Sequence, residues 1–156
     1  MNRKRIALFF VLILLITYSA FSKDLAASQI SGKSLRELLS QEYYKDSSID
    51  EDGDLLIKTG GVNLYLRIDA ERFLLKFTTS WEKNDSISDA RLNKILCNWN
   101  TEKIFANAYS YNKSIRLQYY MCFDGGVNSE NLNSTLEWLF SLADSFWDFL
   151  EEEDAI

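Results

Sequence analysis

Three stretches of the chain alternate apolar and polar residues with a period of two, and this pattern restricts the fold more than any other feature. The apolar positions are Val62, Leu64, Leu66 and Ile68 in the first stretch, Phe73, Leu75, Phe77 and Trp81 in the second, and Ile115, Leu117, Tyr119, Met121 and Phe123 in the third. Successive side chains of a strand point to opposite faces of its sheet. The alternation therefore predicts antiparallel strands with one face on the core and the other in water.

Turn-forming residues separate these strands and indicate further ones. Short turns are expected at Gly60–Gly61, Asp69–Arg72 and Asn112–Lys113. Glycine permits the positive φ angles that tight turns use. Strands are also expected at residues 54–58 and 104–111, and a short strand could form around Ile49. The prediction is a sheet of about five strands.

Apolar residues recur at helical spacing in three other segments. The predicted helices span residues 33–44, a segment from Ser86 or Ser88 to about Trp99, and a segment from a cap at Asn128 or Ser129 to Leu150. Their apolar stripes comprise Leu35, Leu38, Leu39 and Tyr43, then Leu92, Ile95, Leu96 and Trp99, and finally Leu132, Leu136, Leu139, Phe140, Ala143, Phe146, Trp147 and Leu150. The order helix–strands–helix–strands–helix predicts an α+β fold, an antiparallel sheet with helices packed on one face.

Residues 1–22 have the three parts of a secretory signal peptide. Three basic residues within the first five precede an uncharged, mostly apolar run, and Ala20 and Ser22 provide the small residues of a cleavage site. We expect cleavage after Ser22 and export, which makes the protein periplasmic or secreted. The alternative is a membrane anchor formed by residues 6–22. Residues 23–30 would then form a loose leader, and residues 31–156 one domain.

The charge of the expected mature chain argues against several kinds of partner. The whole chain has 17 Lys and Arg against 23 Asp and Glu, a net charge of −6, and loss of three basic residues with the signal peptide makes it −9. Nucleic acid binding relies on neutralising phosphates with Lys and Arg, so no nucleic acid partner is expected. The same charge disfavours anionic lipid, so no membrane contact is expected beyond the N-terminal segment.

The sequence lacks the residue sets that common catalytic and metal sites require. It contains no His, which removes His-based triads and His metal ligands, and its two Cys cannot complete a four-ligand zinc site. We therefore expect no catalytic residues, no metal and no cofactor. Cys97 lies one position off the apolar side of its helix, and Cys122 lies on the polar side of its strand. The two are expected to point apart and to remain unbonded.

The polar side of the predicted sheet is rich in residue types that occur at protein interfaces. With the Leu-rich sides taken as inward, the outward side chains include Tyr65, Tyr109, Tyr111, Tyr120 and Arg116. Phe105 could join them. Tyr and Arg are enriched at interfaces, so these residues are candidate contacts for a protein partner or for a second copy of the chain. The alternative is that cross-strand tyrosine pairs simply stabilise an exposed sheet.

Four short segments follow one another in an order that is typical of one family. They are Asp50-Glu51-Asp52-Gly53-Asp54 before the strand Leu55–Lys58, Asn98-Trp99-Asn100 before Lys103–Ala106, Gly125-Gly126-Val127-Asn128, and the aromatic helix end Phe146–Leu150. In these segments the chain resembles the YbjN-domain family of bacterial sensory transduction regulators. Together with the first predicted helix, the resemblance covers nearly all of the expected mature chain.

The resemblance implies a fold like that of type III secretion chaperones, which dimerise and bind extended segments of other proteins. The family-motif positions are expected to be structural, with the Asn side chains capping a helix and bridging to the next strand. These positions are Asn98, Trp99, Asn100, Gly125 and Gly126. The expected function is a non-enzymatic, exported interaction or regulatory domain that binds an envelope protein or itself through its sheet face or a strand edge. The alternative is a small-ligand sensor with a pocket between helices and sheet.

Overall fold

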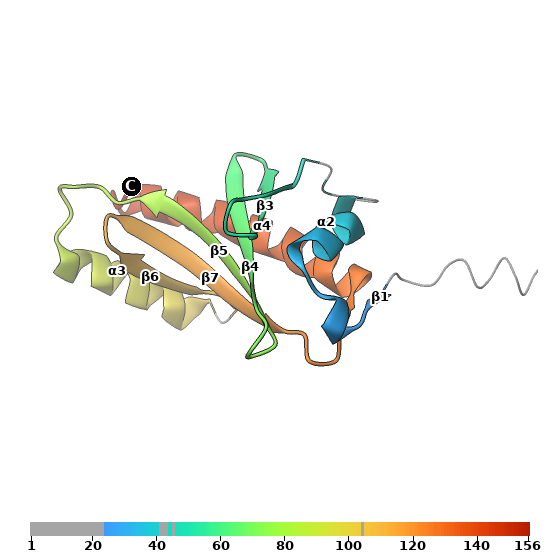
Figure 1. The fold of residues 1–156 in the computed structure, drawn as a ribbon. Coiled ribbons are helices and arrows are strands. Elements are labelled where there is room, and N and C mark those ends of the chain that lie inside the picture. Colours follow the sequence, from blue (N-terminus) through green and yellow to red (C-terminus); the bar gives the residue numbers. More distant parts are fainter. Residues whose placement is uncertain (1–23, 41–43, 45, 104) are drawn as a thin grey trace, which may run out of the picture.

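The computed structural model describes residues 24–40, 44, 46–103 and 105–156, so the predicted signal peptide lies outside the described residues. Along the chain, the elements are β1 (Asp24–Leu25), the 3-10 helix η2 (Ala27–Gln29), α2 (Gly32–Ser40), β2 (Ser48–Ile49), β3 (Leu55–Thr59), β4 (Val62–Asp69), β5 (Leu74–Glu82), α3 (Asp89–Glu102), β6 (Asn107–Tyr111), β7 (Ser114–Cys122), β8 (Val127–Asn128) and α4 (Ser129–Glu152). The predicted α+β class is confirmed (Figure 1).

Within the described residues, six strands form one antiparallel sheet in the order β2–β3–β4–β5–β7–β6, and β1 pairs with β8 in a separate ribbon. The sheet is thus one strand larger than the five or so predicted. The additional strand is β2, where Ser48 pairs with Leu56 and Ile49 with Leu55. Two residues are too few to show an alternating pattern, so the sequence only suggested this strand.

The three alternating stretches form β4, β5 and β7, and their apolar sides face the core. Leu66 of β4, Leu75 of β5 and Ile115 of β7 have no exposed surface. Phe73 departs from the prediction, because its φ of +54° and its 42% exposed side chain place it in the turn before β5. Its ring meets the edge of the Phe123 ring, with the centroids 5.8 Å apart.

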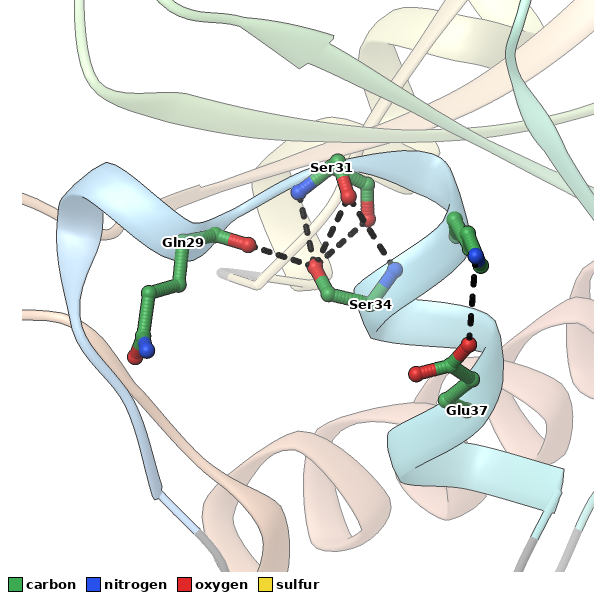
Figure 2. A network of polar contacts seen from close by, with 5 residues as sticks. Gln29, Ser31, Ser34 and Glu37 are labelled. Atoms are coloured by element: carbon green, nitrogen blue, oxygen red, sulfur yellow. Dashed lines mark hydrogen bonds and ion pairs between the residues drawn. The ribbon is translucent and has the colours of Figure 1, made fainter.

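Hydrogen bonds between two serines define the start of α2 (Figure 2). The Ser34 N–H donates to Ser31 Oγ at 3.1 Å, and the Ser31 N–H donates in return to Ser34 Oγ at 2.9 Å. Ser34 also donates its hydroxyl to the Gln29 carbonyl at 2.7 Å. These bonds supply partners for N–H groups that a first helical turn leaves free. Residues 41–43, the end of the predicted helix, lie outside the described residues.

The described residues of α2, α3 and α4 share one core with the inward side of the sheet. Phe146 of α4 has no exposed surface and lies at the centre of a cluster of rings. Its centroid is 5.3 Å from that of Trp81 on β5 and 4.6 Å from that of Trp99 on α3. This cluster joins α4, which runs along the sheet in Figure 1, to β5 and α3 together.

Trp147 lies largely outside the core, contrary to the prediction that put it on the buried stripe of α4. Its side chain is 40% exposed. Consecutive residues of a helix project about 100° apart. Because Phe146 points to the centre of the core, Trp147 projects from the side of α4, at the edge of the buried stripe.

The sheet opens between β4 and β5. Their pairing ends at Tyr65 and Thr78, and the same register would bring Asn63 opposite Ser80, but within the described residues no such pair forms. Beyond that point β4 continues beside β3 and β5 continues beside β7. The two halves of the sheet therefore diverge, as Figure 1 shows.

The segment predicted to be a loose leader is instead paired with the domain. Asp24 and Leu25 of β1 pair with Asn128 and Val127 of β8. Gly126 permits this approach, because its φ is +96° and a Cβ there would lie 2.5 Å from the Leu25 carbonyl oxygen. Glycine at this family-motif position is therefore required by backbone packing.

Replacement of Phe146 by Ala should lower the free energy of unfolding by about 3–5 kcal/mol, because it removes a fully buried ring. Trp147→Ala, the next residue of the same helix, is the control and should cost clearly less, because its side chain is 40% exposed. Urea denaturation followed by circular dichroism measures both losses. Equal losses for the two variants would contradict the docking of α4 described above.

Gly126→Ala should release β1 from β8, because the new Cβ would overlap the Leu25 carbonyl and the positive φ would cost about 1–3 kcal/mol. Gly125→Ala is the matched control, since no atom lies within 4 Å of a Cβ at that position. Amide hydrogen exchange measured by NMR reports the result. We expect faster exchange in β1 and β8 for Gly126→Ala alone, and unchanged rates in that variant would refute the proposed role of this glycine.

Candidate interaction face

The five predicted contact residues project from one surface, the outer face, which is the side of β4, β5, β7 and β6 that points away from the core. Tyr65 lies on β4, Tyr109 and Tyr111 on β6, and Arg116 and Tyr120 on β7. Tyr65, Tyr111 and Tyr120 are 41%, 50% and 47% exposed. Tyr109 and Arg116 are half-buried. Strand register therefore brings residues from distant parts of the sequence onto a single surface.

Contacts between neighbouring side chains orient the outer face. Tyr120 donates its hydroxyl to Gln118 Oε1 at 3.0 Å, and the Gln118 amide donates to Thr78 Oγ1 at 3.3 Å. The Arg116 guanidinium lies over the Tyr111 ring, 4.2 Å from its centroid. A cation–π contact of this kind orients a guanidinium without neutralising its charge.

A charged pair lies toward the β3 side of the outer face. Arg67 donates through Nε and Nη2 to Asp54 Oδ2, at 2.8 and 2.7 Å. The hydrogen bond that Arg67 donates to Asp54 and the negative charge of Asp54 raise the pKa of Arg67 above the ordinary value. Asp50 shapes the loop before β3, because its Oδ1 accepts from the N–H groups of Asp52 and Asp54. The loop thereby holds the Asp54 carboxylate in place for Arg67.

Two other cations of the outer face have no carboxylate partner. Lys76 lies directly opposite Arg67 in the strand register, and like charges in such positions repel each other. Asp54 neutralises Arg67, but among the described residues no carboxylate forms an ion pair with Lys76 or Arg116. Lys76 lies on β5 and Arg116 on β7, the two central strands of this face.

The outer face contains a shallow hollow of about 270 Å³. Its lining residues are Asp50, Asp52, Asp54, Tyr65, Arg67, Lys76, Thr78, Ser80 and Arg116. Acidic groups of the segment before β3 line one part, and Lys76 and Arg116 line another. Such a surface can bind the donors and acceptors of a polar partner.

Asn100 closes the β6 edge of the sheet. Its Oδ1 accepts from the Ala108 N–H at 2.7 Å, and its Nδ2 donates to the Ala108 carbonyl at 2.8 Å. The side chain thus takes the place of a neighbouring strand at this position. Of the other family-motif residues, Trp99 is buried, Asn98 is exposed, and Gly125 is in open space.

Phe105, which the sequence suggested as a member of the outer face, lies on the inner side instead. Its ring stacks on Tyr119 with the centroids 4.2 Å apart, and it meets Trp138 of α4 at 3.7 Å. Tyr119 occupies an inward position of β7, so this contact draws Phe105 toward α4.

Cys97 and Cys122 are unpaired and exposed. In the described ranges, no three His, Cys, Asp or Glu side chains lie close enough together to hold a metal ion. No helix in that part of the chain has both the length and the apolar composition needed to cross a bilayer.

A second hollow of about 550 Å³, here termed the α4 groove, lies where β4 and β5 diverge. Its lining residues are Gly60, Gly61, Val62, Asn63, Thr79, Ser80, Trp81, Asp144, Trp147 and Asp148. Sequence reasoning missed this groove because it assigned Trp147 to the core. The available signal was that Phe146 and Trp147 are adjacent, so only one of them can face the core centre.

Comparisons with known proteins identify the family and a protein of similar fold. The profile of the YbjN family, described as "Putative bacterial sensory transduction regulator", matches residues 31–152. The crystal structure of YbjN from E. coli, described as "a putative transcription regulator", matches with a TM-score of 0.57 and 17% sequence identity, over 73% of this chain and 84% of that chain. No curated protein matches this chain. Because the family profile covers every element from α2 to α4, the chain belongs to the YbjN family, as its sequence motifs predicted.

Proposed function

We propose that this chain is a non-enzymatic interaction domain that binds a protein partner through its outer face. The observation that carries the proposal is the group of exposed tyrosines beside Lys76 and Arg116, two cations without ion-pair partners among the described residues. Tyr and Arg are over-represented among the residues that dominate binding energy at interfaces. The description of the family as sensory transduction regulators supports a regulatory role.

The outer face is a better candidate for binding than the edge of β6. Asn100 already occupies both backbone hydrogen-bonding groups of Ala108, so an added strand could not pair there without displacing it. The resemblance to type III secretion chaperones supports an extended segment as the bound form. Lys76 and Arg116 favour a segment that carries carboxylates.

We also propose that the domain acts after export, in the periplasm or outside the cell. The support for this is the sequence of residues 1–22, with its basic start, apolar run and small residues at Ala20 and Ser22.

A second candidate function is recognition of a small ligand between a helix and the sheet. The observation that favours it is the α4 groove, whose volume of about 550 Å³ is in the range of small-molecule sites.

The double variant Tyr111→Ala/Tyr120→Ala should lose the partner of the outer face. Truncation of two interface tyrosines is expected to weaken binding roughly tenfold or more. In-cell crosslinking with mass spectrometry identifies the partner, and titration of the purified pair measures the affinity. Trp138→Leu is the control, because that side chain is 45% exposed but lies on α4. Full affinity in a folded double variant would exclude the outer face.

Export predicts a chain that begins at Lys23 and is recovered outside the cytoplasm. Cell fractionation followed by intact-mass measurement tests this directly. Leu in place of both Ala20 and Ser22 should block cleavage, because signal peptidase sites need small residues at these two positions. Phe21→Leu, between them, should be cleaved normally. An unaltered chain that keeps its full mass in the membrane fraction would support the anchor of residues 6–22 instead.

A further inference from the structure

The divergence of β4 and β5 leaves an opening that α4 closes from one side. Leu64–Thr79 and Asn63–Ser80 would be the next two pairs of the ladder, but neither forms, and Asn63, Thr79 and Ser80 line the α4 groove. Gly60 and Gly61 contribute a wall without side chains at the β3–β4 turn. The strand side of the groove also includes Asn63, Thr79 and Trp81, and the side of α4 contributes Asp144, Trp147 and Asp148.

Two indole rings line the groove from different elements, Trp81 from β5 and Trp147 from α4. Trp81 is half-buried, and the edge-to-face contact with Phe146 fixes its orientation. Trp147 is 40% exposed, which leaves a large apolar surface in contact with water. An indole is the aromatic side chain that attracts cations most strongly, through the negative potential of its ring face.

Two carboxylates, Asp144 and Asp148, line the same groove one helical turn apart. Like charges at this spacing repel each other. Among the described residues no Lys or Arg forms an ion pair with either of them. A positive charge in the groove would relieve this repulsion.

Thr79 adds a hydroxyl to the lining of the groove. The residue is 3% exposed and lines the groove, and no hydrogen bond from its hydroxyl exists within the described part of the chain. This hydroxyl is therefore a hydrogen-bonding group that the groove can offer to water or to a ligand.

We propose that the α4 groove binds an organic ammonium ion, a positively charged nitrogen that carries apolar carbon. The indoles of Trp81 and Trp147 contact the carbon atoms of the ligand, and the faces of these rings attract its positive charge. Asp144 and Asp148 neutralise that charge, and the Thr79 hydroxyl forms a hydrogen bond with a polar group of the ligand. This inference rests on the second candidate function, a ligand site between α4 and the sheet, and names its ligand class.

The test is titration of the full chain with choline and with the dimethylbutanol isomer in which a carbon atom replaces the choline nitrogen. This alcohol has the same shape as choline but no charge. Binding is followed through tryptophan fluorescence and the indole N–H signals in NMR spectra. We expect choline to bind roughly tenfold more tightly than the neutral compound and to shift the signals of Trp81 and Trp147. A parallel titration uses acetyl-lysine amide, acetylated on its α-amino group so that the side-chain ammonium stays charged, and separates two sources of the cation. Tighter binding of this compound would indicate that the groove binds a lysine of a protein, and tighter binding of choline would indicate a free ammonium compound.

Matched variants locate the site. Trp147→Leu and the double variant Asp144→Asn/Asp148→Asn should each weaken choline binding roughly tenfold, and both should fold because all three side chains are exposed. Trp138→Leu and Glu151→Gln alter exposed residues of the same helix that do not line the groove, and should leave binding unchanged.

Two results would overturn the inference in different ways. Equal affinity for choline and dimethylbutanol would show an apolar ligand site, so the ammonium preference would be wrong while the second candidate function stands. Absence of binding for choline, acetyl-lysine amide and dimethylbutanol would contradict both the ammonium preference and the second candidate function.

Discussion

Phe146 lies with no exposed surface between Trp81 of β5 and Trp99 of α3, and this contact connects the long helix α4 to the sheet and to its neighbouring helix. Leu132, Leu136, Ala143 and Leu150 are fully buried on the same helix. Burial of apolar surface contributes about 25 cal/mol per Å², so this side of α4 is a large part of the core. Because α4 packs on the inner side of the sheet, this helix leaves the outer face uncovered.

The two candidate sites depend on different features of the same sheet. Pairing of β5 with β7, of β7 with β6, and of β4 with β5 as far as Tyr65 and Thr78 aligns the tyrosines of the outer face. The α4 groove lies beyond Tyr65 and Thr78, where β4 and β5 no longer pair. Their charges also differ. The hollow of the outer face combines Lys76 and Arg116 with carboxylates of the segment before β3, whereas the α4 groove is lined by Asp144 and Asp148 and, among the described residues, by no Lys or Arg. The two candidate sites meet at Ser80, which lines both hollows.

Membership of the YbjN family accounts for the backbone more than for these surfaces. At 17% identity to the E. coli protein, the structural likeness establishes the fold alone. Two residues that the sequence analysis expected to be family-motif positions have local structural effects: Gly126 allows β1 to approach β8, and Asn100 occupies the edge of β6. The tyrosines, the cations and the groove are argued from the geometry of this chain itself.

Local patterns in the sequence determined the elements and the inward side of each strand, because alternation and helical spacing report directly which side chains can be buried together. They placed Leu92, Ile95 and Leu96 in the core correctly, and they identified the outer face. Tertiary structure alone decided that β1 pairs with β8, that Phe105 turns inward to Tyr119 and Trp138, and that Trp147 stays outside while Phe146 is buried. These outcomes depend on contacts between segments far apart in the chain and on where one strand pairing ends, and neither leaves a periodic signal in the sequence.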